Sequence, residues 1–115
     1  QLAGIKALSL PDNKLTDIRK EYEKRRDILL TGLKEIGLET SETKATFYVW
    51  IKVPDLYKKE KSPSSKFVAF LLQQCGIITP PGIGFGKYGE GYIRMTLCAN
   101  SVKLEEAIIR LKKNL

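Results

Sequence analysis

The hydrophobic residues of the chain recur at two spacings, one typical of helices and the other typical of strands. After a short helical segment at residues 2–9, apolar residues recur at steps of three and four along residues 14–36. This stripe predicts a long amphipathic helix through Leu15, Ile18, Tyr22, Leu29, Leu33 and Ile36. Asp12 and Asn13 are the expected N-cap region. Gly37, followed by the apolar Leu38, predicts a Schellman ending.

Two further stripes predict shorter helices in the second half of the chain. Ser62-Pro63 is a typical helix start, and Gly76 is the expected end. The buried side is expected to consist of Phe67, Val68, Leu71, Leu72 and Cys75. Asn100 or Ser101 is the expected N-cap of the last helix. Its buried residues are predicted to be Leu104, Ile108, Leu111 and Leu115.

Alternation of apolar and polar residues predicts strands at residues 47–53 and 92–97. A third, very short strand is predicted at residues 77–79. In the first strand, one face is predicted to hold Phe47, Val49, Ile51 and Val53, and the other Tyr48, Trp50 and Lys52. Pro54 ends this strand, and residues 55–65 form a lysine-rich loop. The sequence therefore predicts an α+β fold, a small sheet of about three strands with helices packed on one face. We expect residues 1–115 to form a single domain in which residues 1–37 are a mainly helical lead-in.

Composition excludes several kinds of site. The chain has no histidine, which rules out Ser-His-Asp and Cys-His catalytic arrangements. Two distant cysteines, Cys75 and Cys98, cannot by themselves complete a zinc site, and unpaired thiols suit a reducing, cytoplasmic location. No apolar run is long enough to cross a membrane, and no signal peptide is visible. The first residue, Gln1, is not methionine, so we expect a piece of a longer polypeptide.

The glycine-rich segment at residues 80–91 contains Gly84-Phe85-Gly86-Lys87-Tyr88-Gly89, which matches the dinucleotide-binding pattern G-x-G-x-x-G. That site requires the motif to open a helix, whereas here a strand follows. A protein kinase places such a loop between strands, but the other kinase motifs are missing. We therefore interpret the segment as a connector in which glycine permits unusual backbone angles.

Arg94 stands in the last predicted strand, and it alternates with the apolar residues that should face the helices. It shares its direction with Tyr92 and Thr96, and the side chains of Tyr48 and Trp50 could lie on the same face. From the residues alone, two interpretations of Arg94 stay open. It is either a solvated arginine on the wet side of an open sheet, or a guanidinium that forks onto a carboxylate or phosphate.

Three strings in the same order carry a family resemblance. EYEKRRDILLTGL (residues 21–33), KATFYVWIKVP (44–54) and GIITPPGIGFGKYGEGYIRMTL (76–97) resemble the C-terminal small domain of class I/II, fold type I aminotransferases that use pyridoxal phosphate. The form FGKYGEGYIRMTL is most similar to aspartate and LL-diaminopimelate aminotransferases. The lysine-rich loop at residues 55–65 departs from the usual pattern.

The resemblance implies a specific set of roles. Arg94, the arginine of G-Y-x-R, would bind the substrate α-carboxylate, and the loop through Pro81, Gly82 and Phe85 would line the substrate entrance and close over it. Tyr48 would lie where substrate preference is set. The serine-lysine motif that forms the Schiff base is missing, so no catalytic residue is expected in this chain. The full-length enzyme would bind pyridoxal 5′-phosphate through an absent large domain, form a homodimer, and transfer an amino group between an amino acid and a 2-oxo acid.

The net charge of +7 leaves one alternative. A stand-alone basic binding module could use the Tyr48, Trp50 and Arg94 face to hold a nucleic acid or an anionic protein. The resemblance disfavours a nucleic-acid partner, because it assigns Arg94 to a small carboxylate.

Overall fold

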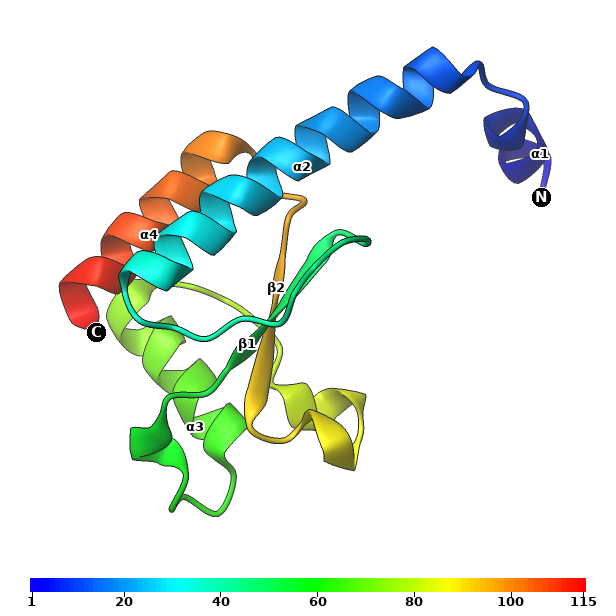
Figure 1. Cartoon of the computed structure of the whole chain (residues 1–115). Coiled ribbons are helices and arrows are strands. Elements are labelled where there is room, and N and C mark those ends of the chain that lie inside the picture. The colour runs from blue at the N-terminus through cyan, green and yellow to red at the C-terminus, as the bar shows by residue number, and fades with distance from the viewer.

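The computed structural model describes all 115 residues and has the element order expected from the sequence. A long helix, α2 (Asp12–Glu35), lies beside the last helix, α4 (Ser101–Asn114), and both pack over a small antiparallel sheet (Figure 1). The sheet is formed by β1 (Tyr48–Lys52) and β2 (Tyr92–Thr96), and α3 (Pro63–Phe70) packs below it. The first helix, α1 (Leu2–Leu8), lies at the end of the projecting half of α2 (Figure 1).

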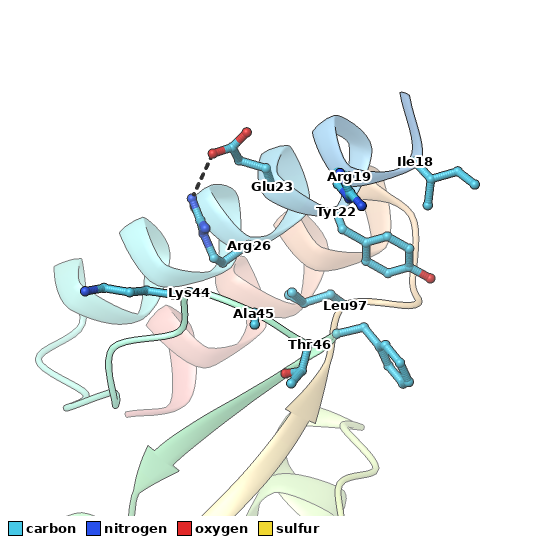
Figure 2. Close-up of a pocket in the computed structure, with 10 residues that line it drawn as sticks. Ile18, Arg19, Tyr22, Glu23, Arg26, Lys44, Ala45, Thr46 and Leu97 are labelled. Carbon is cyan, nitrogen blue, oxygen red and sulfur yellow. Dashed lines mark hydrogen bonds and ion pairs between the residues drawn. The ribbon is translucent and has the colours of Figure 1, made fainter. Parts of the chain in front are cut away.

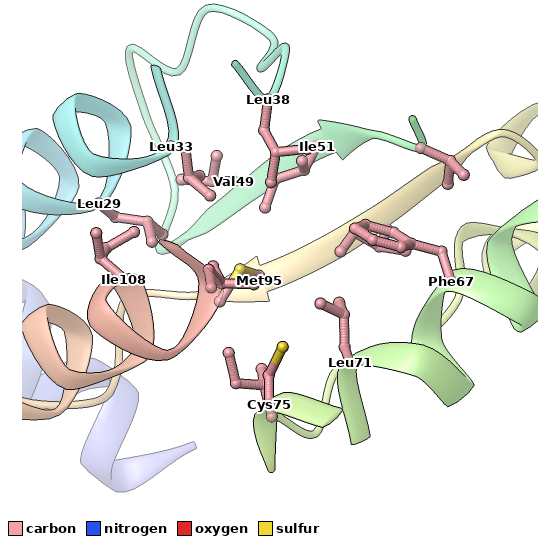
Figure 3. Close-up of a cluster of buried hydrophobic side chains, with 14 of the residues drawn as sticks. Leu29, Leu33, Leu38, Val49, Ile51, Phe67, Leu71, Cys75, Met95 and Ile108 are labelled. Carbon is pink, nitrogen blue, oxygen red and sulfur yellow. The ribbon is translucent and has the colours of Figure 1, made fainter. Parts of the chain in front are cut away.

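The core lies between these helices and one face of the sheet (Figure 3). Val49 and Ile51 from β1 and Ile93 and Met95 from β2 are buried, as the alternation predicts. They meet a second set from the helices, namely Leu29, Leu33, Phe67, Leu71, Cys75, Ile108 and Leu111. The predicted packing of helices on one face of the sheet is therefore confirmed.

The sheet has two strands, so the prediction of about three was wrong. Residues 77–79 do run beside β2, but they form no strand. The buried Thr79 hydroxyl donates to the carbonyl of Arg94 at 2.6 Å, and the Arg94 N–H donates to Pro80 at 3.3 Å. Pro80 and Pro81 have no N–H to donate, so a regular ladder cannot extend along this edge, and only an isolated bridge joins Pro81 to Ile93.

The helix ends follow the predicted signals in most places. Gly37 has φ of +76°, and hydrogen bonds from Gly37 N to Lys34 O and from Leu38 N to Leu33 O, both 3.0 Å, form the predicted Schellman motif. Asn100 caps α4, because its side chain accepts from the N–H of Lys103 at 2.9 Å. Neither Asp12 nor Asn13 caps α2, which already includes both residues and begins after Pro11.

Other local expectations need correction. Phe47 lies outside β1 and is exposed, although its carbonyl accepts from the N–H of Leu97 at 2.9 Å. The helix begun at Pro63 is α-helical only to Phe70, and Leu71–Cys75 form a π-helical turn before Gly76 (φ +62°). Leu72 and Leu115 are exposed rather than buried, because the turn and the last residue of the chain lie at the edge of the core.

Candidate functional site

Arg94 occupies the middle of β2, directly opposite Trp50 of β1. The burial of β2 alternates, so Ile93 and Met95 face the core while Arg94 projects to the other side of the sheet. Its backbone is held on both sides, by the pairing with β1 and by the two hydrogen bonds with Thr79 and Pro80. The position of Arg94 is therefore set by main-chain contacts that do not involve its own side chain.

The guanidinium of Arg94 lies between two aromatic rings. Its central carbon is 3.8 Å from the ring centroid of Tyr48 and 4.0 Å from that of Phe85. Trp50 meets the Phe85 ring edge-on at 5.3 Å and 80°. Both ring contacts are short enough for cation–π attraction, and together they restrict the orientation of the guanidinium plane. Tyr48, Trp50 and Arg94 thus share a face, as the strand alternation predicts, and the glycine-rich loop adds Phe85.

The polar edge of this guanidinium has no partner in the chain. The Nε atom is buried without a hydrogen bond, and none of the ion pairs involves Arg94. By contrast, Arg25 and Arg26 on α2 pair with Glu21 and with Asp27. A buried donor without an acceptor costs about 1–3 kcal/mol. An anion that reached the edge of Arg94 would remove that cost.

The aromatic row continues from Tyr48 toward α2. The ring of Phe47 lies 4.3 Å from that of Tyr48 and 6.3 Å from that of Tyr22. Thr46 precedes this pair with φ of +71°, a conformation rare for a β-branched residue, and its hydroxyl accepts from the N–H of Tyr48 at 3.3 Å. Nothing in the local sequence indicated the unusual backbone at Thr46.

An open hollow of about 330 Å³ lies beside this row, between α2 and residues 44–47 (Figure 2). Arg19, Arg26 and Lys44 line it, but two of these cations are already neutralised. Arg26 pairs with Glu23 at 3.4 Å as well as with Asp27, and Lys44 pairs with Glu42 at 3.2 Å. The hollow is therefore a weaker anion site than the unpaired edge of Arg94.

The remaining predicted site residues, Pro81 and Gly82, form the base of the glycine-rich loop. Pro81 forms an isolated bridge with Ile93, and Gly82 is buried where the two ends of the loop meet. The loop itself contains two short 3₁₀ turns, η3 (Gly82–Phe85) and η4 (Lys87–Gly89), and leads into β2. Its G-x-G-x-x-G string opens no α-helix, so the geometry needed for a dinucleotide pyrophosphate is absent, as predicted.

The arrangement also contains a residue that the sequence analysis did not single out. Glu90, at the end of the loop, accepts hydrogen bonds from the N–H groups of Ser64 (2.8 Å) and Gly91 (3.0 Å). Desolvation raises the pKa of Glu90, but the hydrogen bonds from the N–H groups of Ser64 and Gly91 act in the opposite direction, and the pKa lies below its ordinary value. Ser64 and Glu90 are far apart in the sequence, and no spacing pattern links them.

The chain brings together no group of three or more His, Cys, Asp or Glu side chains that could hold a metal ion. None of its helices combines the length and the apolar character that crossing a bilayer demands.

Comparisons with known proteins agree with one another. The family model for aminotransferase class I and II matches residues 1–111. The LL-diaminopimelate aminotransferase of Aquifex aeolicus is 45% identical over 112 residues, and that of Halothermothrix orenii is 41% identical over 114 residues. The alignments cover 97% and 99% of this chain, respectively, and 28% of each relative. The crystal structure of an aromatic aminotransferase from Pyrococcus horikoshii superimposes with a TM-score of 0.82 at 34% identity, covering 94% of this chain and 28% of that one.

The chain thus spans about 28% of the length of the curated relatives it matches. The match to the family model nevertheless extends over almost the whole of this sequence, and the fold agrees with that of solved aminotransferases. The chain belongs to the aminotransferase class I and II family.

Proposed function

We propose that this chain is the part of a pyridoxal-phosphate-dependent aminotransferase that binds the substrate carboxylate. The intact enzyme would transfer an amino group between an amino acid and a 2-oxo acid, and this chain would be its C-terminal small domain. The observation that carries the proposal is the guanidinium of Arg94, stacked between Tyr48 and Phe85 with its Nε buried and unpartnered. Family membership supplies the reaction class.

The stacked arrangement suits a carboxylate for a geometric reason. The rings of Tyr48 and Phe85 cover the two faces of the guanidinium, so an approaching group meets the N–H donors in the plane. A carboxylate has two oxygens at a spacing that matches this fork, and a bidentate pair is both stronger and better oriented than a single contact. The same rings shield the two faces of the guanidinium from water, which strengthens an interaction made at its edge.

The same arrangement argues against the alternative of a binding module for nucleic acid. Such modules stack bases on free aromatic faces. Here Tyr48 already lies against Arg94 and Phe47, and Trp50 lies against Phe85. The ring faces of Tyr48 and Phe85 that contact the guanidinium are therefore not free to stack on bases, and the donors of Arg94 point to a small anion.

The residues of this chain do not fit the cofactor itself. Pyridoxal phosphate needs a lysine for the Schiff base, and when bound it withdraws electrons from the amino acid's reacting carbon. The lysine on the Arg94 face of β1, Lys52, forms an ion pair with Glu39 at 2.6 Å, and Lys44 pairs with Glu42. We therefore assign the cofactor and the catalytic lysine to the rest of the enzyme, and to this chain only the binding and orientation of substrate.

The further assignments rest on the family. Pro81, Gly82 and Phe85 would line the entrance for substrate, and Tyr48 would contribute to substrate preference. The curated relatives at 41–45% identity carry the name LL-diaminopimelate aminotransferase, which makes LL-diaminopimelate the first amino donor to test. A homodimeric enzyme in the cytoplasm is consistent with the family and with two unpaired cysteines.

The test is substitution of Arg94 in the complete enzyme. Arg94→Ala removes the fork, and we expect kcat/KM for the amino donor to fall by roughly 30-fold or more, from a loss of about 2–5 kcal/mol. Arg94→Lys keeps the charge but not the bidentate geometry, so its kcat/KM should lie between the values of Arg94→Ala and the wild type. Steady-state kinetics with a series of donor concentrations measures both values.

The matched control is Arg19→Ala, which removes an exposed arginine of α2 that forms no ion pair. Its kcat/KM should stay within about twofold of the wild type, as is usual for exposed substitutions of this kind. If Arg94→Ala leaves the apparent affinity for the donor unchanged in a folded enzyme, Arg94 is not the carboxylate ligand.

A further inference from the structure

The loop that carries Phe85 is closed tightly at its base. A Cβ atom on Gly82 would overlap the carbonyl oxygen of Gly89 and lie 2.5 Å from that of Tyr92, and a Cβ on Gly89 would overlap the carbonyl of Gly82. Only two glycines allow the two backbone segments to approach this closely. The loop therefore leaves and rejoins the body of the molecule at one point, immediately before Glu90.

Glu90 fastens this point to the start of α3. Its Oε1 atom accepts from Ser64 N at 2.8 Å and from Gly91 N at 3.0 Å. Ser64 lies in the first turn of α3, where N–H groups have no intrahelical acceptor. The preceding Ser62 does not supply the cap, because its hydroxyl pairs with that of Ser65. A carboxylate from the loop thus replaces a local N-cap.

The charge of Glu90 is used in this contact and not in an ion pair. Lys52, Lys58 and Tyr92 line the same surface hollow as Glu90. Each lysine has another partner, since Lys52 pairs with Glu39 and Lys58 with Asp55. The hydrogen bonds that Glu90 accepts therefore join the base of the loop to the start of α3.

Four residues, 86–89, separate this anchor from Phe85, and the 3₁₀ turn η4 (Lys87–Gly89) occupies most of that interval. Phe85 lies against the guanidinium at 4.0 Å and against Trp50. We propose that Glu90 is a positioning residue, which holds the loop so that Phe85 covers Arg94, and that it thereby raises the affinity for the substrate carboxylate. This inference rests on the proposed function of Arg94.

The experiment compares Glu90→Ala and Glu90→Gln in the complete enzyme. Loss of the anchor in Glu90→Ala should raise KM for the amino donor by about tenfold, the equivalent of one lost hydrogen-bonded contact, with kcat within about threefold. Glutamine retains an oxygen that can accept from Ser64 and Gly91, so Glu90→Gln should raise KM by no more than about threefold. If Glu90→Ala does not fold, Glu90→Asp shortens the reach and should raise KM in the same way.

A double-mutant cycle separates positioning from a general loss of stability. Glu90 acts through Phe85 in this proposal, so Glu90→Ala should change KM by less than about twofold in a Phe85→Ala enzyme. Asn100→Ala is the matched control, because it removes a helix N-cap of α4 and should leave KM unchanged. Independent, additive effects of the Glu90 and Phe85 substitutions would overturn the proposal.

The Arg94→Ala enzyme distinguishes the two levels of inference. If Arg94→Ala impairs donor binding and Glu90→Ala does not, Glu90 has no positioning role and the function of Arg94 stands. If Arg94→Ala has no effect on donor binding, both proposals fail together.

Discussion

Two opposing effects act on the Glu90 carboxyl group. Its ordinary pKa is 4.5; desolvation raises it, and the hydrogen bonds at the start of α3 lower it by more. Because the folded pKa is the lower one, the unfolded chain binds more protons in acid, and folding stability falls as the pH falls through the folded pKa. The stabilising contribution is complete above pH 4.5 and is lost below it.

This pH dependence can be isolated with Glu90→Gln in the 115-residue chain. At neutral pH the variant should have a lower free energy of unfolding than the wild type, because a neutral acceptor caps α3 less well. As the pH falls through the folded pKa of Glu90 the two proteins should converge, since Glu90 then becomes protonated in the folded state as well. Urea unfolding at a series of pH values measures the free energy of unfolding of both proteins. The other carboxylates titrate alike in the two proteins, so their contributions cancel in the difference. A difference that stays constant from pH 7 to pH 3 would show that the charge of Glu90 is not involved.

At the level of single residues, the sequence could predict Arg94 but not its environment. Period-two alternation in residues 92–97 places Arg94 opposite the core, and the family resemblance supplied its proposed role. Phe85 was expected at the entrance, yet its contact with the guanidinium depends on the turns of the loop. The role of Glu90 could not be predicted from the sequence, because its partner Ser64 belongs to another element. The contact exists only once the loop and α3 are packed together.

At the level of elements, Gly32 determines how closely α2 and α4 approach. A Cβ on Gly32 would lie 2.6 Å from Cγ1 of Ile108, which is buried. Gly32→Ala gains about 1 kcal/mol of helix propensity but overpacks the contact, at about 1–3 kcal/mol. We therefore expect a net loss of about 1 kcal/mol in the free energy of unfolding, measured with urea.

A second substitution tests the cause of that loss. Ile108→Val removes the terminal methyl of the contact, so Gly32→Ala should cost less in the Ile108→Val background than in the wild type. An equal cost in both backgrounds would place the effect in the helix backbone and not in the packing of α2 on α4.

Helix boundaries and strand pairing differed in how well they could be predicted. The Schellman ending at Gly37 and the cap at Asn100 are local, so the residues next to them determine the outcome. The expected third strand at residues 77–79 does not form, because a sheet ladder requires N–H donors on both strands. The two prolines that follow, Pro80 and Pro81, have no N–H to donate. Ile77-Ile78-Thr79 has the composition of a strand, but Ile78 is 87% exposed.

At the scale of the whole molecule, the two halves of α2 have different environments. The half near α4 buries Leu29, Gly32 and Leu33, whereas the other half projects from the body and carries α1 at its end (Figure 1). No residue of α1 is buried, and Leu8 is 91% exposed. The principal dimensions of 50 × 30 × 23 Å reflect this projection.

Hydrogen exchange in the 115-residue chain should resolve these two regions. A helix without tertiary contacts is only marginally stable in water, so the amides of α1 and of residues 12–18 should exchange by local opening, with little protection. The amides of residues 29–33 should be protected close to the level of global unfolding, because opening them exposes the core between α2, α4 and the sheet. The measurement should be made at concentrations where the chain is monomeric, because self-association could cover the exposed Leu2, Ile5 and Leu8. Equal protection of both regions in the monomer would mean that the projecting segment folds back onto the body, and the arrangement of α1 and the first half of α2 would then be different in solution.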